Sequence, residues 1–170
     1  LVFGVKRDVT TEHEGEVSTI LHDEISEGDM INLSAPVGGF SIENTERPQL
    51  FIGSGVGMTP LVSMFKKAAS LNVPTQMIQA VVTEDERPFA QKLDSITDNY
   101  EQAQLHLHVK DKEGYLEAKE LEQYLSEQPE IYICGGTKFL HSIINSLKEL
   151  NYDMNHVHFE TFIPRLSVQV

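Results

Sequence analysis

A glycine-rich turn between an apolar strand and a helix constrains the fold of this chain more than any other feature. The turn, GSGVGMTP at residues 53–60, follows the apolar residues 50–52 and precedes a helical pattern. Its three alternate glycines lack the Cβ atoms that would keep a ligand away from the main chain, and Pro60 suits the first position of a helix. Free amides and the helix dipole both favour negative charge, so the turn predicts a dinucleotide site, although its spacing departs from G-x-G-x-x-G. The residues also allow a purely structural turn in which Thr59 caps the helix.

Strand and helix patterns alternate from Gln49 onward, which predicts a doubly wound α/β domain with a parallel sheet. We expect strands at 50–53, 75–82, 105–109, 131–134 and 157–160, and helices at 59–70, 89–97, 117–125 and 138–150. In such sheets, ligands bind at the carboxyl ends of the strands, where the strand order switches. The glycine-rich turn lies at one such end, and Cys134-Gly135-Gly136 lies at another.

The residues before this domain predict a smaller, incomplete unit. We expect a strand at 1–6, a helix over 17–25 that starts near Gly15 to Ser18, a strand at 30–33 and a closing turn at 35–40. The polar residues 44–48 then link this unit to the α/β domain. Because the chain begins at Leu1 and not at a methionine, we expect it to be part of a longer protein.

Composition and charge argue against several classes of function. The formal net charge is −13, from 26 acidic and 13 basic residues, and phosphate-backbone binding depends on clustered Lys and Arg, so we expect no nucleic-acid partner. The single cysteine, Cys134, excludes an internal disulfide and a cysteine-ligated metal cluster within these residues. No apolar run approaches the roughly 20 residues of a membrane helix and no leader pattern opens the chain. We therefore expect a cytoplasmic protein without a membrane partner.

Two histidine pairs, His106-x-His108 and His156-x-His158, each place two side chains on one face of a strand. Neither pair has a third ligand at matching spacing. We therefore expect structural histidines and no metal site.

Seven segments, in order along nearly the whole chain, carry a resemblance to the ferredoxin-NADP reductase superfamily. They are VKRD at 5–8, GEVSTILHD at 15–23, GD at 28–29, APVGGF at 35–40, GVGMTPL at 55–61, YICGG at 132–136 and HFETF at 158–162. Within the superfamily the chain most closely resembles the reductase region of flavohemoglobins, whose activity is nitric oxide dioxygenation. The resemblance implies the C-terminal part of an antiparallel β-barrel FAD-binding domain at 1–45 and an NAD(P)-binding domain at 46–170.

The resemblance assigns both pyrophosphate sites to helix starts. Glu16, Val17 and Ser18 are implied to bind the FAD pyrophosphate, while the residues alone equally allow that Ser18 only caps a helix. The nicotinamide cofactor is implied to lie on the glycine-rich turn, with Thr59 close to the nicotinamide. The implied contact residues of that turn are Gly53, Gly55, Val56, Gly57, Met58, Thr59 and Pro60.

Two further segments are implied to lie beside the reacting rings. Cys134, with Gly135 and Gly136, would flank the nicotinamide, and we interpret Cys134 as a positioning group because no base beside it is identifiable. Glu160 would act next to the flavin ring, and the residues that follow it, Thr161, Phe162, Ile163 and Pro164, would contact the flavin. Ile163 stands where the family commonly has glycine. From the residues alone, Cys134 reads as a small buried side chain and Glu160 as a solvated one.

The resemblance implies an electron relay from NAD(P)H to FAD and, by single electrons, to the heme of a fused globin domain. The cofactors carry this chemistry, and the protein supplies geometry and a dry pocket. The acidic run Glu84-Asp85-Glu86 follows the second strand with only Arg87 nearby, which favours NADH over NADPH. The family's Arg-x-Tyr-Ser flavin motif is absent from these residues, so we expect weak FAD retention.

Two alternatives stay open at this stage. The chain could be the reductase component of an oxygenase system that delivers electrons to an iron–sulfur protein. It could also be a nucleotide-binding interaction module without a redox role. The residues upstream of Leu1 would separate these from the flavohemoglobin hypothesis.

Overall fold

The computed structural model of the chain describes residues 3–7, 15–35 and 38–161. The chain divides into two compact units, Leu1–Gly39 and Phe40–Val170, which we describe separately. Among the described residues, no helix is both long enough and apolar enough to cross a lipid bilayer. The functional division into residues 1–45 and 46–170 stays a prediction.

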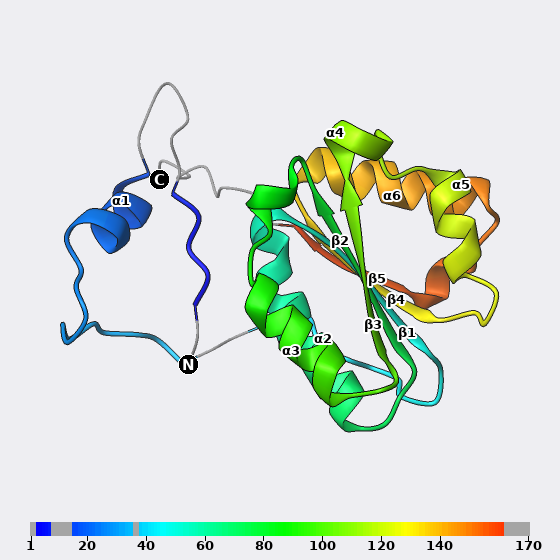
Figure 1. The fold of residues 1–170 in the computed structure, drawn as a ribbon, viewed down its shortest axis with the longest axis horizontal. Helices are drawn as coiled ribbons and strands as arrows, with labels where there is room; N and C mark the ends of the chain where they lie inside the picture. The colour runs from blue at the N-terminus through cyan, green and yellow to red at the C-terminus, as the bar shows by residue number, and fades with distance from the viewer. Residues whose placement is uncertain (1–2, 8–14, 36–37, 162–170) are drawn as a thin grey trace, which may run out of the picture. The chain divides into compact units, whose positions relative to one another are not determined.

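The second unit is built on a five-stranded parallel sheet with the order β3-β2-β1-β4-β5 (Figure 1). β1 lies at the centre and pairs with β2 on one side and with β4 on the other, with Gly53 in register with Cys134. The strand bounds are β1 Gln49–Ser54, β2 Thr75–Val81, β3 Ala103–Val109, β4 Glu130–Gly135 and β5 Val157–Thr161. These five strands confirm the predicted parallel sheet, with bounds that differ by at most two residues at an end.

Helices cover both faces of this sheet. α2 Met58–Ser70 and α3 Ala90–Asn99 pack on one face, and α5 Ala118–Leu121 and α6 Thr137–Glu149 pack on the other (Figure 1). The short α4 Lys110–Glu113 follows β3 directly, and four 3₁₀ segments complete the unit: η1 Gly55–Gly57, η2 Glu84–Glu86, η3 Glu122–Tyr124 and η4 Met154–His156.

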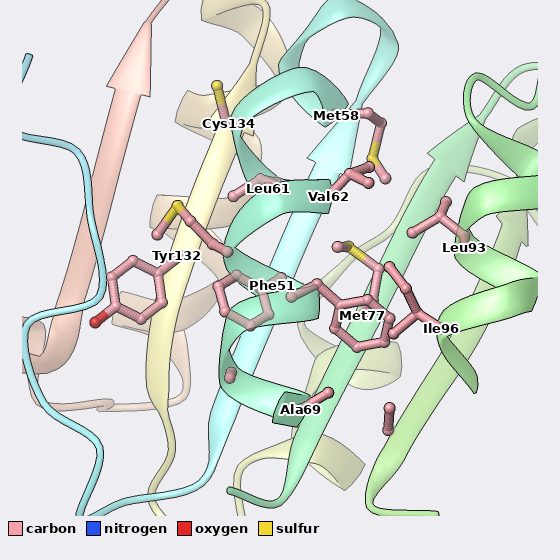
Figure 2. Close-up of a cluster of buried hydrophobic side chains, with 14 residues drawn as sticks. Phe51, Met58, Leu61, Val62, Ala69, Met77, Leu93, Ile96, Tyr132 and Cys134 are labelled. Carbon is pink, nitrogen blue, oxygen red and sulfur yellow. The ribbon is translucent and has the colours of Figure 1, made fainter. Parts of the chain in front are cut away.

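Alternation along the strands divides the core into two clusters. Phe51 and Tyr132 face α2, where they stack with ring centroids 5.3 Å apart, and Figure 2 shows them among the side chains of α2, β2 and α3. Leu50 and Ile133 face the opposite side and pack against α5 and α6. Strands buried on both faces in this way give the near-continuous apolar runs that identified them in the sequence.

Two predicted helix positions need correction. The helix after the glycine-rich turn begins at Met58, so Pro60 is its third residue and not its first. The position is still compatible with proline, because the first four amides of a helix have no intrahelical acceptor. The predicted helix 117–125 is helical only to Leu121 and continues as the 3₁₀ turn η3.

The first unit contains one described helix, α1 Glu16–Asp23, where a helix over 17–25 was expected. The strands predicted at 1–6 and 30–33 are wrong for the described residues, because neither segment pairs with a neighbouring strand and a strand exists only through such pairing. An ion pair between Arg7 and Asp23 and a contact of 3.0 Å between His22 Nε2 and the Val5 carbonyl tie α1 to the start of the chain. Apolar side chains in this unit stay exposed, up to 98% for Met30.

Candidate dinucleotide-binding site

The candidate site lies at the carboxyl edge of the sheet, between the ends of β1 and β4. From β1 the chain passes through α2 to β2 on one side of the sheet, whereas β4 lies on the other side of β1 and leads through α6 to β5. The strand order therefore switches between β1 and β4. Such a switch point is where open α/β sheets bind their ligands.

Two of the three alternate glycines are required by packing within the protein. A Cβ atom on Gly53 would lie 2.5 Å from Met58 Sδ, and one on Gly57 would lie 2.2 Å from the Cys134 carbonyl oxygen. The sequence alone suggested that all three glycines make room for a ligand. At Gly53 and Gly57, however, the atoms nearest to an added Cβ belong to the protein itself. These glycines let the start of α2 lie directly against the end of β4.

Gly55 is the glycine that faces open space. Its φ is +55°, a left-handed conformation that side chains disfavour, and an added Cβ would meet nothing within 4 Å. Gly136, at the start of α6, has the same open surroundings and is exposed. Main chain at Gly55 and Gly136 is therefore open to approach from outside the protein.

Two helices begin at this switch point. η1 runs directly into α2, α6 begins after Gly136, and the first turns of α2 and α6 hold no acidic side chain. Unpaired amides and the positive end of the dipole make such starts favourable for an anion. The donor set therefore fits a pyrophosphate.

Thr59 does not cap the helix. Its hydroxyl donates to the Val56 carbonyl oxygen at 2.8 Å, and the N-cap of α2, Gly57, receives no side-chain cap bond. The cap that the structural-turn alternative gave to Thr59 is therefore wrong. Val56, Thr59 and Pro60 are partly exposed on the turn, whereas Met58 is fully buried in the core below it and offers only its main chain to a ligand.

Cys134 lies at the end of β4 with its side chain fully buried in the α2-side cluster (Figure 2). Burial, with a smaller contribution from the negative charge of Glu160, raises the pKa of the Cys134 thiol to about 12. The thiol is therefore neutral near pH 7, which suits a packing role and not a nucleophile. The next residue, Gly135, leaves room for the Phe139 ring, which lies 2.6 Å from where a Cβ would be.

Glu160 on β5 is in register with Cys134 and is exposed. Gly135 is in register with Thr161, so the structure brings β5 beside the Cys134-Gly135-Gly136 strand end as the sequence implied. Phe162, Ile163 and Pro164, the other residues assigned to the flavin, lie outside the described residues.

In the first unit, α1 begins after Gly15 without a side-chain cap. The Ser18 hydroxyl donates to the Gly15 carbonyl oxygen at 2.9 Å, and Gly15 is the N-cap of α1, so the alternative in which Ser18 only caps this helix is wrong. Glu16 is an acidic side chain in the first turn, and its own charge disfavours an anion there. The assignment of Glu16, Val17 and Ser18 to FAD stays a prediction.

The four histidines of the two pairs have contacts within the protein. His106 packs edge-on against Tyr124, and His108 Nε2 lies 3.0 Å from the Gly114 carbonyl oxygen. His156 and His158 both bond the buried Glu130 carboxylate, at 2.8 and 2.9 Å. Within the described residues, no group of three or more His, Cys, Asp or Glu side chains could hold a metal ion.

Sequence reasoning missed an ion pair at this edge of the sheet. Glu84 Oε1, after β2, lies 2.7 Å from Lys112 Nζ, after β3. The signal available in the sequence was only that both residues follow the carboxyl ends of strands, and the neighbouring order of β2 and β3 was needed to bring them together.

Comparison with known proteins agrees with this geometry. A family model described as oxidoreductase NAD-binding domain matches residues 51–144, which contain the glycine-rich turn and the Cys134-Gly135-Gly136 strand end. A flavohemoprotein of Bacillus cereus is 30% identical over 172 residues, which cover 92% of this chain and 43% of that protein. Flavohemoprotein B of Dictyostelium discoideum is 29% identical over 169 residues and covers 91% and 40%.

A solved structure has the same fold. The flavohem-like FAD/NAD-binding domain of a nitric oxide dioxygenase from Vibrio cholerae superposes with a TM-score of 0.85 at 28% identity, covering 94% of this chain and 70% of that one. The chain spans less than half the length of the flavohemoproteins that it matches.

Proposed function

Because the chain belongs to the family of oxidoreductase NAD-binding domains, we propose that it is the nicotinamide-binding part of a flavohemoprotein reductase region. The observation that carries this proposal is the switch in strand order between β1 and β4. There the open main chain at Gly55 and Gly136 meets the starts of α2 and α6.

The residues of the glycine-rich turn would have different roles in holding the cofactor. Amides of Gly55 and Val56 at the start of the turn would receive the pyrophosphate, while Gly53 and Gly57 let the turn pack against its own protein. Thr59 is held in place by its bond to Val56. Because the packing at Gly53 and Gly57 and the Thr59 bond fix the turn, the cofactor would meet a preorganised surface.

Cys134 and Glu160 would lie beside the nicotinamide and flavin rings. A neutral thiol at Cys134, fully buried in the core, would support this strand end from below without competing as a nucleophile, and Glu160 would supply an exposed carboxylate one strand away. We assign both as groups that position the rings. Gly136 is exposed at the same strand end, whereas Gly135 is buried beneath it. We keep Gly135 and Gly136 on the nicotinamide side and assign Thr161, Phe162, Ile163 and Pro164 to the flavin.

When bound, NAD(P)H supplies a hydride that FAD accepts and passes on as single electrons. In the whole protein the acceptor would be heme in a fused globin domain, which with oxygen would support nitric oxide dioxygenation and thus nitric oxide detoxification. The support for this finer assignment is the naming of the similar proteins, two flavohemoproteins and a nitric oxide dioxygenase domain.

We propose NADH as the preferred nicotinamide cofactor. Arg87 is the cation next to the acidic run at 84–86, and its guanidinium is engaged by Asp94 at 3.0 Å and by Gln79 Oε1 at 3.4 Å. Carboxylates repel a 2′-phosphate and accept a hydrogen bond from a 2′-hydroxyl.

Titration of the chain with NADH, followed by the fluorescence of the reduced nicotinamide, tests the proposal. We expect saturable binding, and severalfold weaker binding by Gly55→Ala, because its Cβ would occupy the open space at the turn. Gly28→Ala, in the first unit, also in open space and also at a positive φ of +102°, serves as the matched control. Absence of NADH binding by the unaltered chain, or equal binding by Gly55→Ala, would contradict the site as described.

A further inference from the structure

An ion pair at the carboxyl edge of the sheet joins the loops that follow β2 and β3. Glu84 lies in η2, after β2, and Lys112 lies in α4, after β3. Lys112 Nζ lies 2.7 Å from Glu84 Oε1, and the two side chains are 61% and 57% exposed. The pair therefore lies on the surface at the same edge as the glycine-rich turn.

The position of this pair relative to the glycine-rich turn follows from the strand order. The inference drawn from that position rests on the proposed function. β2 and β3 lie on the side of β1 away from β4. With the nicotinamide at β4 and the pyrophosphate at β1, the adenosine half would extend toward β2 and β3. Neighbouring strands are about 4.8 Å apart, so the end of β3 is about 10 Å from the turn. Glu84 and Lys112 are the charged groups that join these two strand ends.

The backbone that carries Lys112 is fixed by local bonds. The Asp111 amide donates to the Val82 carbonyl at 3.1 Å, which ties α4 to the end of β2. The Val109 amide donates to Glu113 Oε1 at 2.8 Å, which closes the short helix onto the end of β3. Because its backbone is held in this way, Lys112 can change its partner only by a change of side-chain rotamer.

The cations of the two loops all have partners within the protein. Lys112 pairs with Glu84, Arg87 pairs with Asp94, and Lys110 Nζ lies 4.6 Å from the centre of the Tyr115 ring. The same loops carry further carboxylates, at Asp85, Glu86 and Asp111. Acidic groups therefore outnumber basic ones at this end of the sheet, and the lysine that could offset them is held by Glu84.

We propose that Glu84 is a specificity-determining residue, which discriminates against a 2′-phosphate by engaging the Lys112 ammonium. A phosphate group carries about −1.5 to −2 charges at neutral pH, so it needs a cation that is free to pair with it. A 2′-hydroxyl has no such need. Loss of the Glu84 charge removes one repulsive group and releases Lys112 at the same time.

The experiment is a calorimetric titration of the full chain with AMP and with 2′-phospho-AMP, which differ only in the 2′-phosphate. We expect Glu84→Gln to tighten binding of 2′-phospho-AMP about threefold to fivefold, the scale of an exposed ion pair, and to leave AMP binding unchanged. In Glu84→Gln with Lys112→Gln, the gain should be lost. Glu149→Gln changes the net charge equally at the far end of α6 and should change neither affinity.

Three results would overturn this inference: no tightening in Glu84→Gln, tightening that persists without Lys112, or equal tightening in Glu149→Gln. The last would assign the effect to net charge alone. Failure of the unaltered chain to bind AMP or NADH would instead overturn the proposed function, so the two failures are distinguishable.

Discussion

At the scale of single residues, the three alternate glycines of the turn have different roles that only the fold reveals. In the sequence they are equivalent, because the absence of a Cβ says nothing about which atoms lie opposite. The structure places Met58 opposite Gly53, the Cys134 carbonyl opposite Gly57, and open space opposite Gly55. The strand, turn and helix around these glycines were predictable from local sequence. Their different surroundings were not, because the atoms opposite Gly57 come from a strand almost 80 residues away.

Gly57→Ala tests the packing role of the turn. An added Cβ would overlap main-chain atoms of Cys134 and Gly135, which cannot move aside as a flexible side chain can. We expect a loss of about 1–3 kcal/mol in the free energy of unfolding, measured by urea denaturation. Gly39→Ala, where the Cβ meets nothing within 4 Å, is the control. Equal stability of the two variants would show that the start of α2 does not pack on β4 as described.

The reactivity of Cys134 follows from its burial. Because burial raises the pKa of its thiol to about 12, the folded protein holds almost no thiolate at pH 8, and the thiolate is the reacting form. We expect Ellman's reagent to leave the folded chain unlabelled and to label one thiol per chain after guanidinium unfolding. Rapid labelling of the folded protein would contradict a closed, neutral thiol at this position.

At the scale of elements, the sequence predicted every strand of the sheet and its major helices, because apolar periodicity records burial on one or two faces. It missed α4 and η2, which are too short to show a period. α4 depends on contacts with other parts of the chain, such as the Asp111 amide bond to Val82. The prediction of strands at 1–6 and 30–33 was wrong for the described residues, because an alternating pattern without a pairing partner does not make a strand.

A carboxylate at the amino ends of β4 and β5 links those strands to the segment before β1. Glu130, 3% exposed, accepts bonds from His156 and His158 and lies 3.8 Å from Arg47 Nε. Arg47 in turn lies 2.9 Å from His156 Nε2. This cluster lies at the edge of the sheet opposite the glycine-rich turn, and its bonds tie β4, η4 and β5 to the segment before β1.

The stability of the fold should therefore depend on the titration of Glu130. Burial alone would raise its pKa, but the hydrogen bonds of His158 and His156 outweigh burial and lower the pKa below the ordinary value of 4.5. The ionised form thus stabilises the fold at pH values above the unfolded pKa, and this contribution is lost as the pH falls through the folded pKa.

Glu130→Gln tests this dependence. We expect a loss of about 1–3 kcal/mol at pH 7, because the histidines lose a charged acceptor, and a smaller further loss on acidification than in the unaltered chain. Unfolding by urea across a series of pH values measures both effects, with Glu149→Gln as the control. Parallel pH profiles for Glu130→Gln and the unaltered chain would contradict the link.

At the scale of the whole molecule, the two proposed cofactor sites are distributed differently between the units. The glycine-rich turn and the Cys134 strand end both belong to Phe40–Val170, the unit with the sheet and both core clusters. The residues assigned to FAD come from both units, with Glu16 to Ser18 in the first and residues 160–164 in the second. The proposed nicotinamide site therefore needs only residues of the second unit.

This difference predicts that the chain binds NADH and holds FAD weakly. The first unit buries no residue of α1 and leaves apolar side chains exposed, so it offers the flavin little preorganised surface. After incubation with FAD and gel filtration, the ratio of flavin absorbance to protein should be well below one FAD per chain. The same sample should retain saturable NADH binding in the fluorescence titration. NADH binding in the same sample shows that the chain is folded, so low FAD content cannot be assigned to unfolding. FAD held stoichiometrically through the column would contradict the prediction, because it would show that the residues present suffice for the flavin site.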